Sequence, residues 1–421
     1  MSNESLLSRE AALWLGEQQA TARSDLIMLA SQNSGSSNLD GLLAMAGTIE
    51  SWFDLKEGGV RPVAASRTSL PARRIVSNDG EVSTSATGPI LRWDLRPQAA
   101  RRVLLVIHYD TVFGINHEFQ SCQMLDDDRM GGPGVADAKG GIVVIRNSVR
   151  ALEQFHLADE IGLTVVLNPD EEVGSLSSAG YLQEIASDFD FGLLFEPALP
   201  TGELVGQRKG SGNFEIVVNG RAAHAGRHFE DGRNAVALLS RIFVALDDLN
   251  LEMDRCTVNV GECHGGVAVN VVPPVAVGRF NIRVEDDQTA QEVVNRVDSI
   301  IRSANEADGF EVQLFGGMTS PPKTLTPAME ELMGAIGNVT EAVQGNRVQW
   351  RSTGGVCDGN KLAAAGLPNI DTMGPVGDGL HSSGEWVQVS SLAEKAAVVV
   401  ELIARYASGA LPELERRKSA L

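Results

Sequence analysis

The chain has 421 residues, 43% of them hydrophobic and 21% charged, a composition typical of globular proteins that fold in water. A chain of this length is too long to fold around one hydrophobic core of ordinary size, so we expect two domains. With 55 acidic and 35 basic residues the net charge is −20, which disfavours nucleic acid and anionic membranes as partners, and no apolar run is long enough to span a bilayer.

The cysteines and the N-terminal segment both favour a cytoplasmic location. The four cysteines are scattered without a CxxC pair, so we expect reduced thiols rather than a disulfide framework. The first twenty residues include early acidic residues and lack a basic region followed by an apolar run, which argues against a secretory signal. We therefore expect a cytoplasmic protein.

The first half of the chain alternates helical and strand-like patterns. Apolar side chains recur at helical spacing in residues 5–31 and 38–56. Residues 103–107 are a continuous apolar run of the kind buried on both faces of a sheet, and residues 163–167 form a second strand-like run. A helical pattern at 141–155 lies between them. This alternation predicts an α/β fold with a mixed, mostly parallel sheet flanked by helices.

The pattern changes near Lys209. Residues 213–219 alternate in the manner of a half-exposed strand, and five further elements are expected at 234–249 (helix), 257–261 (strand), 278–284 (strand), 289–304 (helix) and 310–315 (strand). The order strand–helix–strand–strand–helix–strand is that of a ferredoxin-like α+β domain. We expect this domain, residues 210–319, to be inserted into a discontinuous first domain formed by residues 1–209 and 320–421.

Acidic and histidine side chains follow several of the strand-like runs. These residues are His108, Asp110, Asp137, Glu171, Glu172, Glu196 and His381. If the runs are strands of one parallel sheet, their ends meet at its carboxyl edge, where such sheets bind ligands. Two imidazoles and several carboxylates gathered there suit a pair of divalent cations that share a bridging carboxylate.

Taken singly, most of these segments also have a structural interpretation. The alternatives are a strand-end histidine satisfied by a neighbouring carboxylate for His108, a helix N-cap for Asp137 and a solvated charge pair for Glu171 and Glu172. For His381 they are a loop histidine or part of a helix start with Ser382 and Glu385. Glu196 is harder to explain without a partner, because its carboxylate ends an apolar run. The joint pattern favours a metal site.

Seven segments in order carry a resemblance to a known family: HYDTV, GPGVADAKGG, NPDEEVGS, FEP, GRAAHAG, GGVCDGNKLAAAGLP and GPVGDGLHSSGEWV. They resemble the dizinc metallopeptidases that include glutamate carboxypeptidases, acetylornithine deacetylase, succinyl-diaminopimelate desuccinylase and aminoacylase. The resemblance extends from about residue 30 to 405 and is closest to the glutamate carboxypeptidase branch. It implies a zinc exopeptidase-like fold, with the inserted domain acting as lid and dimerisation module of a homodimer.

The resemblance also implies a ligand set for two zinc ions, for which cobalt or manganese could substitute. Asp137 would bridge the ions, His108 and Glu196 would share one of them, and Glu172 and His381 would share the other. Glu171 would be the general base, and Asp110 would orient His108. The peptide bond after Asp137 is typically cis in this family.

Four further residues match positions that contact substrate. By resemblance, His224 reaches the partner subunit's active site and polarises the scissile carbonyl, while Asn270, Arg283 and Gly355 bind substrate. The alternating pattern of its strand places Arg283 opposite an apolar face. The forked guanidinium of arginine suits a substrate carboxylate.

Together these features imply hydrolysis of the amide between an acyl or aminoacyl group and an amino acid with a free carboxylate. An N-acyl amino acid deacylase, acting on acetyl or succinyl groups, and a catalytically silent dimeric binding protein of the same fold remain alternatives. Cys357 and Lys361 depart from the family pattern near the presumed substrate pocket. The acyl group and the preferred amino acid therefore stay open.

Overall fold

The structure, a computed structural model, describes residues 9–53 and 64–415. The chain begins with three helices, α1 (Arg9–Glu17), α2 (Gln19–Ala30) and α3 (Leu39–Trp52). They fall within the predicted helical regions, of which residues 5–8 and 54–56 lie outside the described part of the chain. None of the helices described is both long and apolar enough to cross a lipid bilayer.

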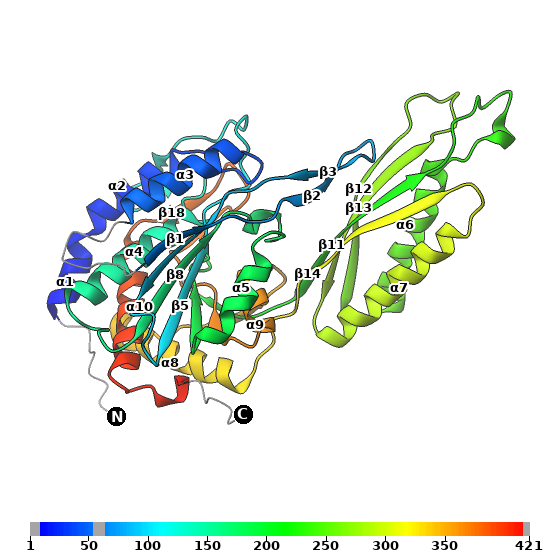
Figure 1. The fold of residues 1–421 in the computed structure, drawn as a ribbon. Helices are drawn as coiled ribbons and strands as arrows, with labels where there is room; N and C mark the ends of the chain where they lie inside the picture. The colour runs from blue at the N-terminus through cyan, green and yellow to red at the C-terminus, as the bar shows by residue number, and fades with distance from the viewer. Residues whose placement is uncertain (1–8, 54–63, 416–421) are drawn as a thin grey trace.

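A six-stranded sheet forms the centre of the larger body (Figure 1). Its order is β1 (Ala64–Thr68), β4 (Ile90–Leu95), β8 (Gly162–Asn168), β5 (Arg102–His108), β9 (Phe191–Leu194) and β16 (Asn369–Ile370). The last four strands are parallel, β4 pairs antiparallel with β8, and β1 pairs antiparallel with β4 at the edge. The predicted mixed, mostly parallel sheet is confirmed.

Helices cover both faces of this sheet. On one face, Val103, Leu105 and Ile107 of β5 pack in a core with α4 (Lys139–Gln154), α8 (Pro327–Gln344) and α10 (Ser390–Ala407). On the other face, Leu104 and Val106 pack with α5 (Ala179–Ile185) and α9 (Asp358–Ala364). Both faces of β5 are buried, which explains why its sequence is a continuous apolar run.

Two smaller sheets lie in the same body. One is antiparallel, with the order β17 (Gly377–Asp378), β18 (Trp386–Gln388), β7 (Arg129–Gly131) and β6 (Gln123–Met124). The other pairs β10 (Leu204–Arg208) with β15 (Trp350–Thr353) in parallel. The described residues also contain four 3-10 turns: η1 (Glu171–Val173), η2 (Ala186–Asp188) and η4 (Pro412–Leu414) in this body, and η3 (Phe229–Asp231) in the inserted segment.

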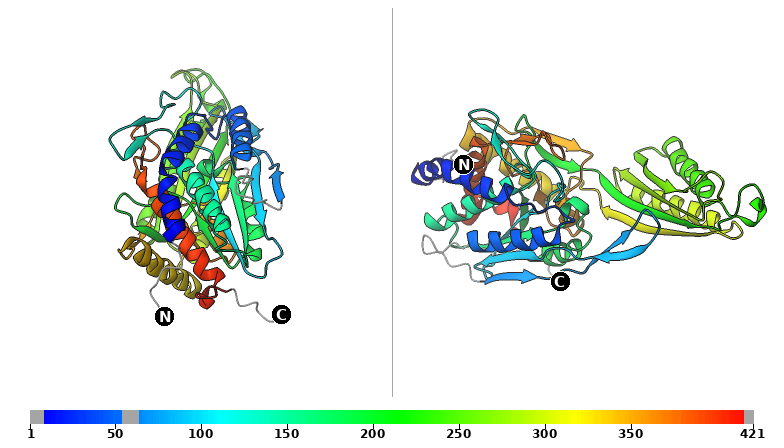
Figure 2. Two further views of the ribbon diagram at one scale, coloured as in Figure 1. Left: turned by 90° about the vertical axis from the view of Figure 1, so that its left-hand side faces the viewer. Right: turned by 90° about the horizontal axis from the view of Figure 1, so that it is seen from above.

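The inserted segment forms an arm that projects from the larger body (Figures 1 and 2). Its antiparallel sheet has the order β12 (Cys256–Gly265), β13 (Val275–Val284), β11 (Gly210–Asn219) and β14 (Glu311–Ser320), with α6 (Ala235–Glu252) and α7 (Asp287–Asn305) on one face. This is the ferredoxin-like arrangement that the sequence predicts. The arm has its own apolar core beneath the two helices.

A hairpin that the sequence pattern did not predict joins the two bodies. Strands β2 (Arg73–Val76) and β3 (Val82–Ser85) extend to the face of the arm sheet that the helices leave open (Figure 1). There Val76 packs against Val217 and Val277, and Arg279 Nη2 donates to the Val76 carbonyl at 2.6 Å. The hairpin has no long apolar run, so its position depends on these contacts with the arm.

Candidate metal centre

Three parallel strands deliver side chains to one edge of the main sheet. His108 is the last residue of β5, and its register partner Asn168 ends β8, just before η1 with Glu171 and Glu172. Glu196 lies two residues beyond β9. This placement follows the expected geometry, because parallel strands end at the same edge.

Asp137 and His381 reach the same place from the small antiparallel sheet. Asp137 lies in the loop between β7 and α4, and His381 lies between β17 and β18. The expectation that every segment follows a strand of one parallel sheet is therefore wrong for these two residues. For Asp137 the reason is that the preceding strand, β7, pairs with β18 in the small sheet. For His381 it is that β16 has only two residues, after which the chain leaves the main sheet.

Asp137 lies between two histidines. Its Oδ1 is 3.1 Å from Nε2 of His108, and its Oδ2 is 3.3 Å from Nε2 of His381. On the first side, Glu196 Oε2 is 3.7 Å from Nε2 of His108. On the second, Glu172 Oε2 is 3.1 Å from Nε2 of His381. The two oxygens of one carboxylate thus face two separate His–Glu pairs.

Burial and neighbouring charges shift the protonation of this cluster. Burial raises the pKa of Glu171 well above its ordinary value, and the negative charge of Glu196 raises it further. Burial likewise raises the pKa of Glu172 to about 7, and hydrogen bonds to Asp137 and Glu172 raise the pKa of His381 to about 11. The clustered carboxylates repel one another when ionised, and a bound positive charge relieves this repulsion. A divalent cation supplies such a charge.

The donor set fits a divalent metal. His108, Asp137 and Glu172 each offer one ligand atom, and these three atoms lie within 4.8 Å of one another. Imidazole nitrogen and carboxylate oxygen bind zinc at roughly 2 Å, so donors this close can share an ion. Cobalt and manganese accept the same ligands.

Asp110 holds the segment that carries the two glutamates. Its Oδ1 and Oδ2 accept hydrogen bonds from the backbone N–H groups of Glu171 (3.1 Å) and Glu172 (3.2 Å). The same Oδ1 lies 3.3 Å from Nδ1 of His108, and the Asp110 side chain is fully buried. Asp110 therefore orients a histidine and a carboxylate pair at once. The peptide bond between Asp137 and Ala138 is cis, as the resemblance implies.

The structure does not bring His224 or Asn270 to this cluster within one chain. Both are exposed, and they lie close together, since Ala225 N–H donates to the Asn270 carbonyl at 3.0 Å. They occupy the loops that follow β11 and β12, at the end of the arm away from the main sheet (Figure 2). Arg283 and Gly355 lie at the other end, where Arg283 Nη1 donates to the Gly354 carbonyl at 3.0 Å.

The two residues that depart from the family pattern are buried. Cys357 is 2% exposed and its sulfur accepts a hydrogen bond from Gly359 N–H at the start of α9. Lys361 is 1% exposed, and its Nζ contacts Ser175 Oγ at 2.9 Å and Asp358 Oδ1 at 3.2 Å. Lys361 therefore supports the loop that follows Glu171 and Glu172, a role that its position in the sequence did not indicate.

Glu385 does not start a helix with His381, the structural alternative considered above. Its side chain is 1% exposed and accepts hydrogen bonds from the loop that holds Asp137. The only signal for Glu385 in the sequence was its spacing from Ser382, which is that of a helix start.

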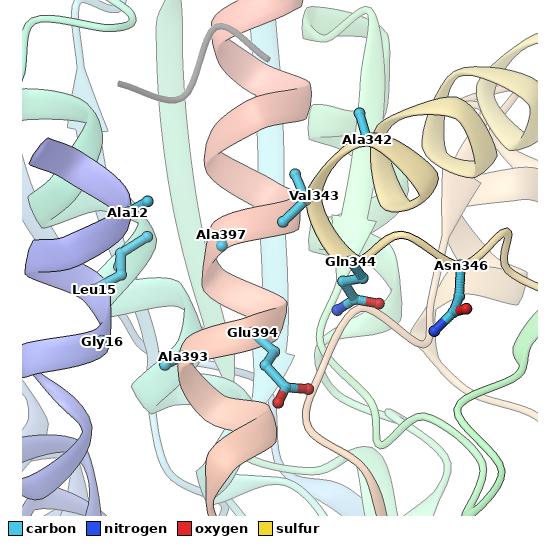
Figure 3. A pocket seen from close by; sticks show the side chains of 10 residues that line it. All are labelled: Ala12, Leu15, Gly16, Ala342, Val343, Gln344, Asn346, Ala393, Glu394 and Ala397. Atoms are coloured by element: carbon cyan, nitrogen blue, oxygen red, sulfur yellow. The ribbon is translucent and has the colours of Figure 1, made fainter. Parts of the chain in front are cut away.

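A cavity elsewhere in the molecule is unrelated to this cluster. It has a volume of about 640 Å³ and lies between α1, α8 and α10 (Figure 3). Its lining is mainly apolar and includes none of the clustered carboxylates or histidines. The cavity therefore offers no chemistry comparable to that of the metal centre.

Comparison with known proteins finds sequence similarity to a carboxypeptidase and to desuccinylases. Residues 206–309 match the family model described as the peptidase dimerisation domain. Carboxypeptidase G2 of Pseudomonas sp. (strain RS-16) is 26% identical over 320 residues, which cover 75% of this chain and 76% of the relative. Succinyl-diaminopimelate desuccinylase of Bordetella parapertussis is 28% identical over 348 residues, with coverage of 77% and 88%.

Solved structures share the fold over nearly the whole chain. An M20 family metallo-carboxypeptidase from Sulfolobus solfataricus aligns with a TM-score of 0.73 at 16% identity and covers 92% of this chain and 99% of its own. The dipeptidase Dug1p from Saccharomyces cerevisiae aligns with a TM-score of 0.72 at 15% identity, with coverage of 94% and 98%.

Proposed function

Because the chain belongs to the M20 peptidase family, whose members are metal-dependent hydrolases, we propose that it is a two-zinc enzyme that cleaves an amide bond to an amino acid with a free carboxylate. The position of Asp137 carries the proposal, since one carboxylate oxygen faces each imidazole. Such an arrangement suits two ions that share one bridging ligand.

Each remaining side chain of the cluster has a defined role in this proposal. His108 and Glu196 would hold one ion, Glu172 and His381 would hold the other, and Asp137 would be the ligand that the two ions share. Two ions bound here would polarise the scissile carbonyl and lower the pKa of the attacking water. Glu171 accepts the proton of that water and returns it to the leaving amine, a task suited to a carboxylate whose pKa is raised.

Arg283 supports a substrate with a free carboxylate. Its guanidinium donates to Asn281 Oδ1 at 2.9 Å and to the Gly354 carbonyl, and no carboxylate within the described residues forms an ion pair with it. A half-buried arginine without an acidic partner can bind a substrate carboxylate through two parallel hydrogen bonds. Gly355, next to Gly354, would offer its backbone to the same substrate.

The test of this mechanism is Glu171→Ala. We expect the variant to keep its zinc and to lose at least about 100-fold in kcat, because general base catalysis contributes factors of this order. The control is Glu160→Ala, which removes an exposed carboxylate that lies just before the start of β8, at the opposite end of that strand from the cluster. More than a tenth of the wild-type turnover in a metal-loaded Glu171→Ala enzyme would remove Glu171 from this role.

A deacylase is the second candidate, because relatives named succinyl-diaminopimelate desuccinylase match 77% of the chain. The same metal pair would serve it, and only the pocket would differ. Comparing kcat/KM on glutamyl dipeptides, N-acetyl amino acids and N-succinyl amino acids decides between the two. Turnover of none of these by enzyme with both ions bound would favour the silent binding protein.

A further inference from the structure

We propose that Glu385 positions the Asp137 loop for the metal pair, so that zinc affinity depends on this residue. The inference rests on the proposed two-ion site and adds a residue to it that touches neither substrate nor metal. Glu385 is one of the most deeply buried carboxylates of the described chain, with 1% of its surface exposed. A buried carboxylate needs several donors to remain stable.

The donors of Glu385 all come from the Asp137 loop. Its Oε1 accepts from the backbone N–H groups of Ala136 at 2.9 Å and Asp137 at 3.1 Å. Its Oε2 accepts from the N–H of Gly134 at 3.0 Å. Three amides of one short loop are therefore satisfied by a single side chain, and one of them belongs to the proposed bridging ligand itself.

Water cannot easily replace this carboxylate, because the loop is tightly packed. Residues 131–138 are all buried. Gly134 has a φ of 75°, and a Cβ there would lie 2.9 Å from Thr111 Cγ2. A Cβ at Gly132 would lie 2.6 Å from the sulfur of Cys122. A buried amide left without an acceptor costs about 1–3 kcal/mol, so loss of Glu385 should allow the loop to rearrange.

Glu385 also links the Asp137 loop to His381. Ser382 N–H donates to the Gly379 carbonyl at 3.2 Å, and Glu385 N–H donates to the Ser382 carbonyl at 3.1 Å, so residues 379–385 form one compact loop. His381 lies in this loop, and the side chain of Glu385 in the same loop accepts the hydrogen bonds from the Asp137 loop. Since Asp137 faces both histidines, displacement of its loop should weaken the binding of both ions.

The decisive variant is Glu385→Gln. An amide has one acceptor oxygen instead of two and presents an NH₂ group to a backbone N–H that needs an acceptor. Zinc affinity is measured by competition with a chromophoric chelator on the purified full-length protein. We expect both zinc equivalents to bind about 10–100-fold more weakly, the usual effect of losing a residue that orients metal ligands.

Asp94→Asn is the matched control. Asp94 is also a buried carboxylate, 9% exposed, and it accepts hydrogen bonds from Arg92 and Thr164. Thr164 lies in β8 four residues before the strand end that borders the metal centre. We expect Asp94→Asn to lower thermal stability and to leave zinc affinity within about threefold of wild type.

Three outcomes are distinguishable. A wild-type protein that binds no zinc overturns the proposed function. Wild-type zinc binding with equal affinity in Glu385→Gln overturns the role of Glu385 alone. If Glu385→Gln does not fold, the test uses Glu385→Asp, and the measurement is amide hydrogen exchange of the metal-free protein. Faster exchange than in the wild type at residues 131–139 supports the proposal, and exchange as slow as in the wild type overturns it.

Discussion

At the scale of single residues, adjacent carboxylates acquire different surroundings because neighbouring side chains of a one-turn helix point in different directions. Glu172 Oε2 is 3.1 Å from Nε2 of His381, whereas Glu171 is influenced by Glu196, His108 and Lys361. These surroundings support the proposed division of roles, in which Glu172 is a metal ligand and Glu171 the general base. This difference could not be assigned from the dipeptide alone.

Arg283→Met tests the recognition of substrate at the same scale. We expect KM for a substrate with a free carboxylate to rise about 10–100-fold, because a charge-assisted bidentate contact is lost. A substrate amidated at that carboxylate should be cleaved equally by the variant and the wild type. The comparison of kcat/KM on the free and amidated substrates is the measurement.

Arg279→Met is the control for this prediction. Arg279 lies on the same face of β13, but its guanidinium is already paired with Glu215 at 2.9 Å and Glu262 at 2.7 Å. Its loss should lower stability without changing the preference for a free carboxylate. If Arg279→Met and Arg283→Met change the preference alike, Arg283 has no specific part in recognition.

At the scale of elements, helix α10 carries a lysine, Lys395, that is buried in the core. The helix packs against α4 and α8, and most of its side chains are buried. Lys395 is among them, 8% exposed, and burial lowers its pKa to about 8. Below pH 8 the lysine is charged in both the folded and the unfolded state, so the folded protein bears the full cost of burying that charge.

Lys395→Met should therefore stabilise the protein at neutral pH, by up to about 3 kcal/mol. Between about pH 8 and 10.5 the unfolded wild-type chain holds the lysine proton more tightly than the folded chain, so wild-type stability should rise with pH in this window. The variant should lack this part of the rise. Denaturant unfolding at pH 7 and pH 10 measures both effects, and equal gains at the two pH values would contradict the assignment.

At the scale of the whole molecule, the arm separates residues that the proposed mechanism needs together. The ten residues of β11 place His224 roughly 30 Å from the base of the arm, at about 3.3 Å per residue. Beside Asn270, Val267 and Val269 are 95% and 104% exposed, as expected for residues that a partner covers. We propose a homodimer in which His224 completes the partner's site, with the arm as residues 210–319 and the metal-binding domain as 1–209 and 320–421.

Mixed dimers test this arrangement. Glu171→Ala and His224→Ala should each be nearly inactive alone. In a mixed dimer one site combines an intact Glu171 with an intact His224 from the other chain, so random mixing of equal amounts should recover about a quarter of wild-type activity. Activity assayed after co-refolding is the measurement, and no recovery in verified mixed dimers would place His224 outside the partner's site.

The amino-acid pattern by itself identified the central strands of the main sheet and the elements of the arm, and it suggested the metal chemistry. Predominantly apolar runs identified β5 and β8, because a strand buried on both faces has few polar positions to alternate with its apolar ones. Period-2 and helical patterns identified the ferredoxin-like arm. The ordered motifs identified the family and proposed the ligands, since metal chemistry restricts which residue types can act.

Only the tertiary structure decided how these parts meet. The hairpin β2–β3 has too few apolar residues for the sequence to predict it, and its position depends on contacts with the arm sheet. Local patterns also did not predict the separate sheet whose loops carry Asp137 and His381. Nor did they indicate that Lys361 and Glu385 are buried residues that support the metal centre. Their roles arise from hydrogen bonds between residues far apart in the chain, which no periodicity within a single segment records.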